Sequence, residues 1–177
     1  MKRSIRVAVR AASTALVAVG VGGVVVPTAN ANKTPTIVVG QGIGAKIDQT
    51  EGQVMKALGK PVAKRKTETG EREWQYGTIP KGDALFVFFK HKHVVLITTG
   101  SAPYKTSSGI SVNSLPAEVS KAYPQAKCVL GSGPQPDPGE ESDGCTVTSR
   151  YHGHTVHTVF LWRDSRRTPM FEIVISA

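Results

Sequence analysis

The segment Leu85-Phe86-Val87-Phe88-Phe89-Lys90-His91-Lys92-His93-Val94-Val95-Leu96-Ile97-Thr98-Thr99 carries a clear β-hairpin pattern. Two runs of β-branched and aromatic residues, which favour strands, flank a polar stretch short enough to be a turn. We therefore predict antiparallel strands over 85–89 and 94–99. The first is apolar on both faces, because Leu85, Val87 and Phe89 alternate with Phe86 and Phe88. Such a strand is either covered on both sides or leaves an apolar patch exposed.

The residues before this hairpin predict a third strand and a helix. The stretch 73–76 has strand propensity, and its connection to the hairpin is the length of a turn. Further back, Thr50 and Gln53 have the spacing of a capping box, and Gly59 is a natural helix stop. The apolar positions between them repeat with helical spacing. The predicted unit is a short helix followed by a three-stranded antiparallel meander.

A second copy of this unit follows later in the chain. Residues 112–123 align with 47–58, and the pairs Val54/Val119, Lys56/Lys121 and Ala57/Ala122 are identical. We predict a helix within 114–123, with Ser114 as its cap and Pro116 in its first turn. Strands are predicted over 146–151, 154–162 and 170–175. The predicted fold class is therefore α+β, with two tandem helix-plus-meander units over 32–103 and 104–177.

The first 31 residues have the features of a Sec-type signal peptide. An N-terminal region with four basic residues precedes the uncharged apolar run 11–26, and Ala29-Asn30-Ala31 is a cleavage signature. The run is shorter than the roughly 20 residues that span a bilayer, so we expect no stable membrane anchor after cleavage. The predicted location is therefore outside the cell or in the cell envelope.

The charge and composition indicate a folded globular domain. The 177 residues carry 22 Lys and Arg against 13 Asp and Glu, a net charge of +9, with 40% hydrophobic residues. Removal of the leader leaves 18 basic and 13 acidic residues, a net charge of +5. This balance suits an anionic envelope polymer or an acidic protein partner. Without a dense Arg/Lys stripe, we expect no nucleic-acid partner.

Export makes a disulfide between Cys128 and Cys145 plausible. The pair would close the loop 128–145, which is rich in Pro and Gly and predicts no regular structure. A redox or metal-binding pair is the alternative, but the C-x-x-C spacing typical of such pairs does not occur.

Several short motifs resemble the repeat of the β-lactamase-inhibitor-protein-like fold, which small outer-membrane-assembly lipoproteins share. In chain order they are Gly40-Gln41, Gln53-Val54 and Ala57-Leu58-Gly59-Lys60-Pro61, and aromatic strands follow the last of them. The resemblance covers 38–175 and extends to secreted actinobacterial-type proteins. It implies a sheet face that contacts a secreted hydrolase such as a β-lactamase. The chain has no lipobox Cys, so the membrane anchoring of the lipoproteins does not carry over, and it has one Cys pair where the inhibitor has two disulfides. No motif-level match carries the inhibitor's interface residues onto positions of this chain.

The two H-x-H pairs are candidate metal ligands, because imidazoles two residues apart on a strand share a face. Both pairs fall at expected turns, where this alternation fails, so we interpret them as exposed turn residues. The alternative is a weak zinc or copper site in a small metal-dependent enzyme or metal carrier. The residues concerned are His91, His93, His152 and His154.

The sequence predicts no catalytic centre and no cofactor. A G-x-S-x-G motif does not occur, both cysteines are expected to pair, and the acidic residues are scattered over turns. Basic clusters at 60–72 and 163–167 are interpreted as solvated turns, with anion-binding edges for acidic polymers as the alternative. We therefore expect a protein that is not an enzyme.

Aromatic residues on the strands are the preferred candidate binding face, since interface anchors are rich in Trp, Tyr and Phe. Core packing of these rings is the alternative. On this basis we predict a secreted, non-catalytic binding module of unknown target. An inhibitor of a secreted hydrolase and a metal-dependent protein are the two rival hypotheses. The candidate face consists of Trp74, Tyr76, Phe160 and Trp162.

We expect the exported protein to begin at Asn32, because the cleavage signature ends at Ala31. Intact-mass measurement of the protein recovered from the medium or envelope checks this. A mass that retains residues 1–31, or that includes a lipid, would contradict the prediction.

Overall fold

The computed structural model describes residues 35–130, 143–162, 170 and 172–177. The predicted signal peptide, most of the Pro/Gly-rich loop and the basic cluster at 163–167 lie outside the described residues. No described helix is long and apolar enough to cross a membrane.

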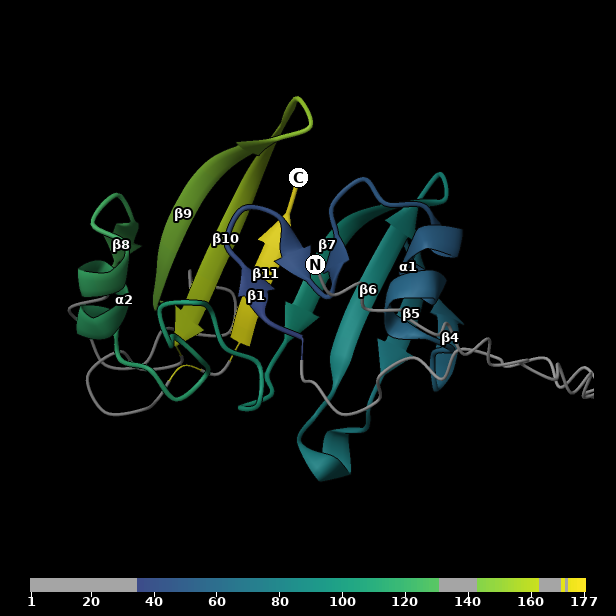
Figure 1. The fold of residues 1–177 in the computed structure, drawn as a ribbon, viewed down its shortest axis with the longest axis horizontal. Coiled ribbons are helices and arrows are strands. Elements are labelled where there is room, and N and C mark those ends of the chain that lie inside the picture. Colours follow the sequence, from purple (N-terminus) through teal and green to yellow (C-terminus); the bar gives the residue numbers. More distant parts are fainter. Residues whose placement is uncertain (1–34, 131–142, 163–169, 171) are drawn as a thin grey trace, which may run out of the picture.

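One antiparallel sheet of eight strands forms the body of the molecule (Figure 1). Its spatial order is β4-β5-β6-β7-β11-β10-β9-β8. Neighbouring strands follow one another in the chain except at the centre, where β7 pairs with β11. The strands are β4 (Ala63–Lys66), β5 (Arg72–Tyr76), β6 (Leu85–Lys90), β7 (His93–Thr99), β8 (Lys127–Val129), β9 (Asp143–Tyr151), β10 (His154–Trp162) and β11 (Glu172–Ser176).

The predicted fold class of two tandem helix-plus-meander units is wrong. The described residues are dominated by strands, and the strands of both halves belong to one continuous sheet rather than to two separate meanders. Within this sheet, two strands were also missed, β4 and β8, and the three short strands of the N-terminal segment described below were not predicted either. Strand β4 is largely basic and β8 has only three residues, so neither shows the apolar alternation that predicts a half-buried strand. The pairing of β7 with β11 joins residues far apart in the sequence, which local patterns do not reveal.

The hairpin of β6 and β7 contains the strands that the aromatic run predicts. Its register pairs Val87 with Ile97 and Lys90 with His93, with an irregularity between Phe88 and Phe89. The turn residues His91 and Lys92 both have positive φ, at 51° and 69°. This conformation closes a tight turn, and it is rare outside glycine and a few polar residues.

Two short α-helices lie on the same side of the sheet. Helix α1 (Glu51–Leu58) begins with the predicted capping box, in which Thr50 Oγ1 accepts from Gln53 N–H and the Gln53 side chain accepts from Thr50 N–H. Helix α2 (Pro116–Ala122) has Leu115 rather than Ser114 at its N-cap. Glu118 accepts from the Leu115 N–H there, so an acidic side chain replaces the expected serine cap.

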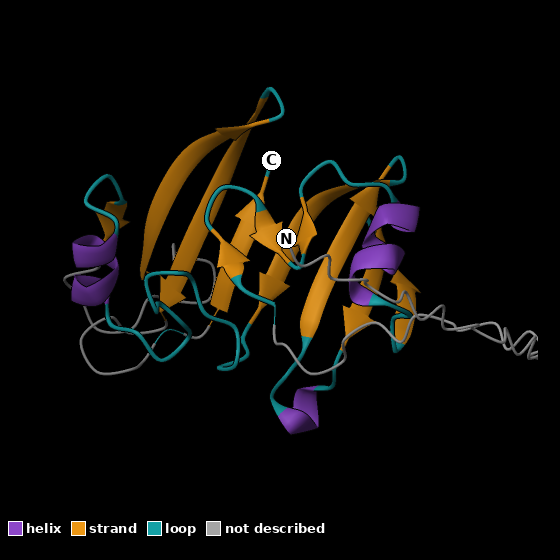
Figure 2. Ribbon diagram, in the orientation of Figure 1, coloured by secondary structure: helices purple, strands orange, loops and turns teal. Residues whose placement is uncertain are grey.

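A small N-terminal sheet covers the centre of the large sheet on the side of the helices (Figure 2). It consists of β1 (Ile37–Val38), β2 (Gly42–Ile43) and β3 (Ala45–Lys46). The Gly40 N–H donates to the buried Thr158 Oγ1 on β10 at 2.9 Å, which ties this segment to the large sheet. Gly40 has a φ of 76°, and a Cβ there would lie 2.4 Å from the Ser149 Cβ, so only glycine fits.

The hydrophobic core lies between the large sheet and these three covering elements. Val54 of α1 and Val119 of α2, which the internal alignment pairs, are both fully buried. From the sheet the core receives alternate side chains of each long strand. These are Leu85, Val87, Phe89, Val94, Ile97, Cys145, Val147, Val156, Phe160, Trp162, Ile173 and Ile175. The opposite alternation therefore defines a second face, on which the described chain places no helix.

The predicted cysteine pair is present. The Sγ atoms of Cys128 and Cys145 lie 2.00 Å apart, at disulfide distance, and the two residues are direct partners in the pairing of β8 with β9. The bridge therefore fixes the short edge strand β8 to the long strand β9. It also ties together the ends of the loop between them.

Replacing Cys128 and Cys145 by Ser should lower the free energy of unfolding by about 2–4 kcal/mol, because the open loop gains freedom in the unfolded state. Urea unfolding measures the loss, and alkylation without reductant should label neither cysteine. Ser120→Ala is the matched control, since the Ser120 hydroxyl contacts Cys128 Sγ at 3.4 Å and its removal leaves the bridge intact. Free thiols in freshly exported protein would contradict the prediction.

Candidate functional site

The four aromatic residues predicted to form a binding face lie in the core. Trp74 and Tyr76 are 3% and 7% exposed, and Phe160 and Trp162 are fully buried. Phe160 stacks on Tyr123 beside α2, and the Trp162 indole N–H donates to the Ser114 carbonyl at 3.0 Å. These residues point to the covered side of the sheet, so they do not form an exposed face in this structure. The rings fill the space beneath the helices instead.

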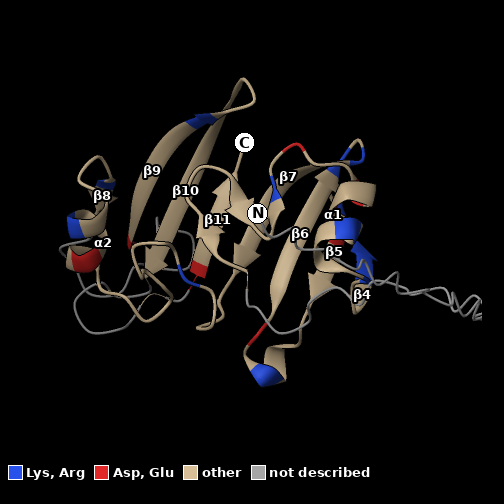
Figure 3. Cartoon of the chain, viewed as in Figure 1, with Lys and Arg blue, Asp and Glu red and all other residues tan. Residues whose placement is uncertain are grey.

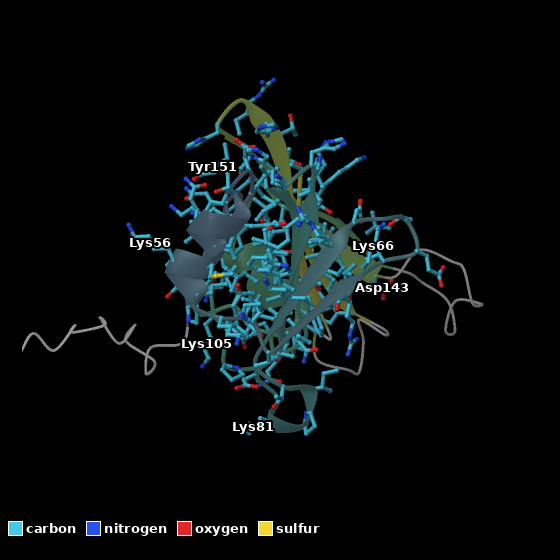
Figure 4. All side chains as sticks on the ribbon, turned by 90° about the vertical axis from the view of Figure 1, so that its right-hand side faces the viewer. Lys56, Lys66, Lys81, Lys105, Asp143 and Tyr151 are labelled. Atoms are coloured by element: carbon cyan, nitrogen blue, oxygen red, sulfur yellow. A yellow bond between two sulfur atoms is a disulfide. The ribbon has the colours of Figure 1, made fainter. Side chains whose placement is uncertain are left out.

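The other face of the sheet, here called the open face, carries the alternate side chains of the same strands. Figure 4 looks along the sheet from the side of β4 and shows α1 with Lys56 on one side of it only. The register aligns the open-face residues into rows that cross the strands. One row runs through Thr146, Val159, Val174, Thr98, Phe86 and Gln75. The next runs through Thr148, His157, Ser176, Leu96, Phe88 and Glu73.

The apolar side chains gather at the middle of the open face, and polar ones lie at both ends. The central group, here called the apolar patch, is partly exposed on four neighbouring strands. It consists of Phe86, Phe88, Leu96, Val159, Leu161 and Val174. Towards β4 the first row continues through Gln75 to Ala63 and the second through Glu73 to Arg65, and towards β8 the first ends in Thr146 and Lys127 and the second in Thr148. An apolar centre with a polar rim is the usual anatomy of a protein-binding surface.

Two local features shape the patch. Thr98 Oγ1 donates to Glu172 Oε1 across β7 and β11, so the carboxylate of Glu172 is held by a neighbouring hydroxyl. Beside Leu161 the sheet carries Gly144, where a Cβ would lie 3.3 Å from Leu161 Cδ2. The absence of a side chain at 144 leaves Leu161 room to extend towards Val129, which is 64% exposed at the end of β8.

The four histidines of the predicted H-x-H pairs do not come together in one cluster, because the first member of each pair lies at a hairpin tip. His91 lies at the tip of the β6–β7 hairpin, and His152 lies at the tip of the β9–β10 hairpin, with its ring 4.2 Å from that of Tyr151. The second member of each pair instead approaches Asp48. His93 Nδ1 lies 3.1 Å from Asp48 Oδ1, and His154 Nε2 lies 3.9 Å from Asp48 Oδ2.

Asp48 therefore joins both hairpins to the N-terminal segment, a role that the sequence analysis missed. The sequence offers one signal for a turn at this position, which is the residue type itself. Asp adopts positive φ more readily than most residues and is common in turns, and Asp48 has a φ of 67°. All three side chains are 42–48% exposed, so the contacts are worth little in isolation. The described residues contain no group of three or more ligands able to hold a metal ion.

Positive charge gathers at the β4 edge of the sheet. Lys64, Arg65 and Lys66 are exposed on this strand, and Figure 3 shows blue segments on β4 and on the neighbouring α1. Lys64 Nζ lies 4.0 Å above the Trp74 ring, a cation–π contact. Arg72 on the next strand pairs with Glu51 of α1 at 2.5 Å. The predicted basic stretch is thus partly an exposed edge strand.

Comparison with known proteins shows similarity of fold alone. No protein-family model matches the chain, and no curated protein matches it significantly. An extracellular protein containing an SCP domain, from Bacillus anthracis str. Ames, has a similar fold with a TM-score of 0.51 and 10% identity over 73% of this chain. The match covers 43% of that protein, so the chain spans less than half of its length. The uncharacterized protein yfeY from Escherichia coli has a TM-score of 0.44 and 13% identity, over 81% of this chain and 99% of that one.

The pKa of the Tyr76 phenol provides a test of the buried position of this residue. Burial raises its pKa to about 12, and its hydroxyl has no hydrogen-bond partner in the described structure. The folded state therefore favours the neutral phenol more than the unfolded state does. The resulting contribution of Tyr76 to the free energy of unfolding is fully present below pH 10 and is lost as the pH rises from 10 through 12. Because Phe lacks the unpaired buried hydroxyl, we expect Tyr76→Phe to be at least as stable as the wild type at pH 8, and its advantage over the wild type to grow by about 2 kcal/mol at pH 12.

Urea unfolding at the two pH values measures this difference. Tyr104→Phe is the control, since burial and the charge of Asp83 also raise the pKa of Tyr104, but its hydroxyl donates to the Asp83 carbonyl. Loss of that hydrogen bond should destabilise the control already at pH 8. Equal pH dependence of Tyr76→Phe and the wild type would contradict the burial of a neutral phenol.

Proposed function

We propose that this chain is an exported, non-catalytic binding module that holds a protein partner against the open face of its sheet. The observation that carries the proposal is the apolar patch, which is partly exposed at the centre of a face whose two ends are polar. The N-terminal segment, α1 and α2 all pack on the other face. Contiguous exposed apolar patches rimmed by polar residues mark interaction sites.

The chemistry of the open face favours binding over catalysis. Its hydroxyl–imidazole contact joins Thr148 Oγ1 and His157 Nδ1 at 3.1 Å, and no described carboxylate contacts that ring. A nucleophile needs a base that a third group orients. The phenyl rings of Phe86 and Phe88 instead supply the large apolar area that anchors protein interfaces.

Export is supported by the basic leader, the apolar run and the cleavage signature at Ala31, all read from the sequence. The cysteine pair at disulfide distance suits an oxidising compartment. The Bacillus anthracis protein of similar fold is itself described as extracellular. The resemblance to β-lactamase inhibitors gives one class of partner to test first, the secreted hydrolases.

The test uses the mature chain to capture partners from culture medium and envelope extract, with purified β-lactamases as defined candidates. Each partner is then titrated against Phe88→Gln and Val159→Gln. Because these side chains lie at the centre of the patch, we expect each change to weaken binding roughly tenfold or more. Ile79→Gln is the matched control, since Ile79 is 69% exposed but lies on the 3₁₀ turn Ile79–Lys81, away from the patch.

Thermal unfolding should show that all three variants fold, because the substituted side chains are partly exposed already. A partner whose affinity is unchanged by both patch variants would contradict the open face as the binding surface. Turnover of a substrate by the mature chain, with loss of that activity in His157→Ala, would contradict the non-catalytic proposal.

A further inference from the structure

Strand β4 lies at one edge of the large sheet, and no described strand pairs with its outer side. In the described chain β4 pairs with β5 on one side only, because it stands first in the strand order. An antiparallel strand directs the N–H and C=O of alternate residues to each side. The outer side of β4 therefore carries donors and acceptors that no described strand satisfies.

The register identifies which residues face outward. The Thr67 N–H donates to the Glu71 carbonyl at 2.8 Å, so Thr67 belongs to a hydrogen-bonded pair. Alternation along the ladder makes Arg65 with Glu73 the next such pair. The N–H and C=O groups of Lys64 and Lys66 consequently point away from β5, to the outer side of the edge.

The side chains surround this main-chain row with positive charge. Lys64 and Lys66 share one face of β4, and Arg65 takes the other. All three are exposed. Two acidic residues lie nearby. Glu51 forms an ion pair with Arg72, and Glu73 lies directly across from Arg65 on β5. Lys60, just before the strand, is also exposed and adds to the same edge.

Charge on an edge strand commonly prevents association with the edge of another sheet. Here the positive charge disfavours other basic strands but not acidic ones. A second copy of β4 would bring like charges together, which disfavours pairing. A strand with acidic side chains would meet lysine and arginine on both faces while its main chain pairs with Lys64 and Lys66. An acidic polymer without amides would gain the charge contacts alone.

We propose that the β4 edge binds an extended acidic peptide of a partner protein by strand addition, with the main chain of Lys64 and Lys66 as its pairing groups. This surface is distinct from the apolar patch, and the inference stands whether or not the open face binds a protein. Strand addition takes affinity from main-chain hydrogen bonds and selectivity from alternate side chains. Here the selectivity is for acidic residues.

The probe is a fluorescently labelled peptide with Glu at alternate positions and Val or Thr between them, titrated into the full mature chain at low salt. A second peptide of equal charge has Pro in place of two of the Val residues, which removes N–H donors from its main chain. We expect the first peptide to bind and the Pro-containing peptide to bind at least tenfold more weakly. Binding should weaken as salt is raised.

Variants of the protein separate charge from main-chain pairing. The double change Lys64→Glu with Lys66→Glu should abolish peptide binding, while Lys81→Glu, at an exposed lysine outside this edge, should leave it intact. Lys66→Ala and Lys66→Pro both remove the charge, but only Pro removes the outward N–H, which β5 does not use. We expect Lys66→Pro to bind several-fold more weakly than Lys66→Ala, with matching thermal stability.

Hydrogen exchange gives a direct readout, since the amide of Lys66 should become protected when the peptide binds. Equal binding of both peptides and of polyphosphate would show an anionic-polymer site and overturn strand addition. Absence of binding at millimolar peptide, or equal affinity of Lys66→Ala and Lys66→Pro, would overturn the proposal as well.

Discussion

The pairing of β7 with β11 is the contact on which the rest of this structure depends. Four registered pairs, from Leu96 with Ser176 to Thr99 with Ile173, join the strands of the first half to those of the second. Without this pairing, here called the seam, each half would be a four-stranded meander with an additional open edge. With it, Ile97 and Ile175 lie side by side at the centre of one core, and both are fully buried. Each half thereby closes the hydrophobic core of the other.

The seam also explains why only one face of the sheet is covered. Each half contributes one short helix, and the N-terminal segment fills the gap between them above β7, β11 and β10. Together these elements are enough to cover one face of an eight-stranded sheet. The remaining face keeps its apolar centre, and the long strands that form the core thus also form the candidate binding surface. Core and candidate site are two sides of the same strands.

Sequence patterns predicted the parts of the fold that local physics determines. The hairpin of aromatic strands, the capping box of Thr50 and Gln53, and the proline in the first turn of α2 all depend on residues close in the chain. The continuity of the sheet, and with it the fold class, could not be predicted this way. It depends on the pairing of β7 with β11, and on two edge strands that are too short or too basic to be recognised from their sequence.

The candidate site was missed for a related reason. Alternation shows that Phe88 and Phe89 lie on opposite faces of β6, but not which face the helices cover. The aromatic residues of β5 and β10 were chosen as the exposed set, and the structure places them under the helices. Asp48 escaped notice because its partners, His93 and His154, come from two different hairpins.

The central position of β11 has a consequence for how the protein reaches this fold. The last strand in sequence lies in the middle of the sheet, so β7 has β6 on one side but lacks its partner on the other side until the chain has been synthesised up to Ser176. Contacts between such distant segments carry a large loop-closure cost, and folds rich in them form slowly. The first half therefore cannot complete its core ahead of the second. Such late closure is compatible with the proposed export, in which the chain would cross a membrane before it folds.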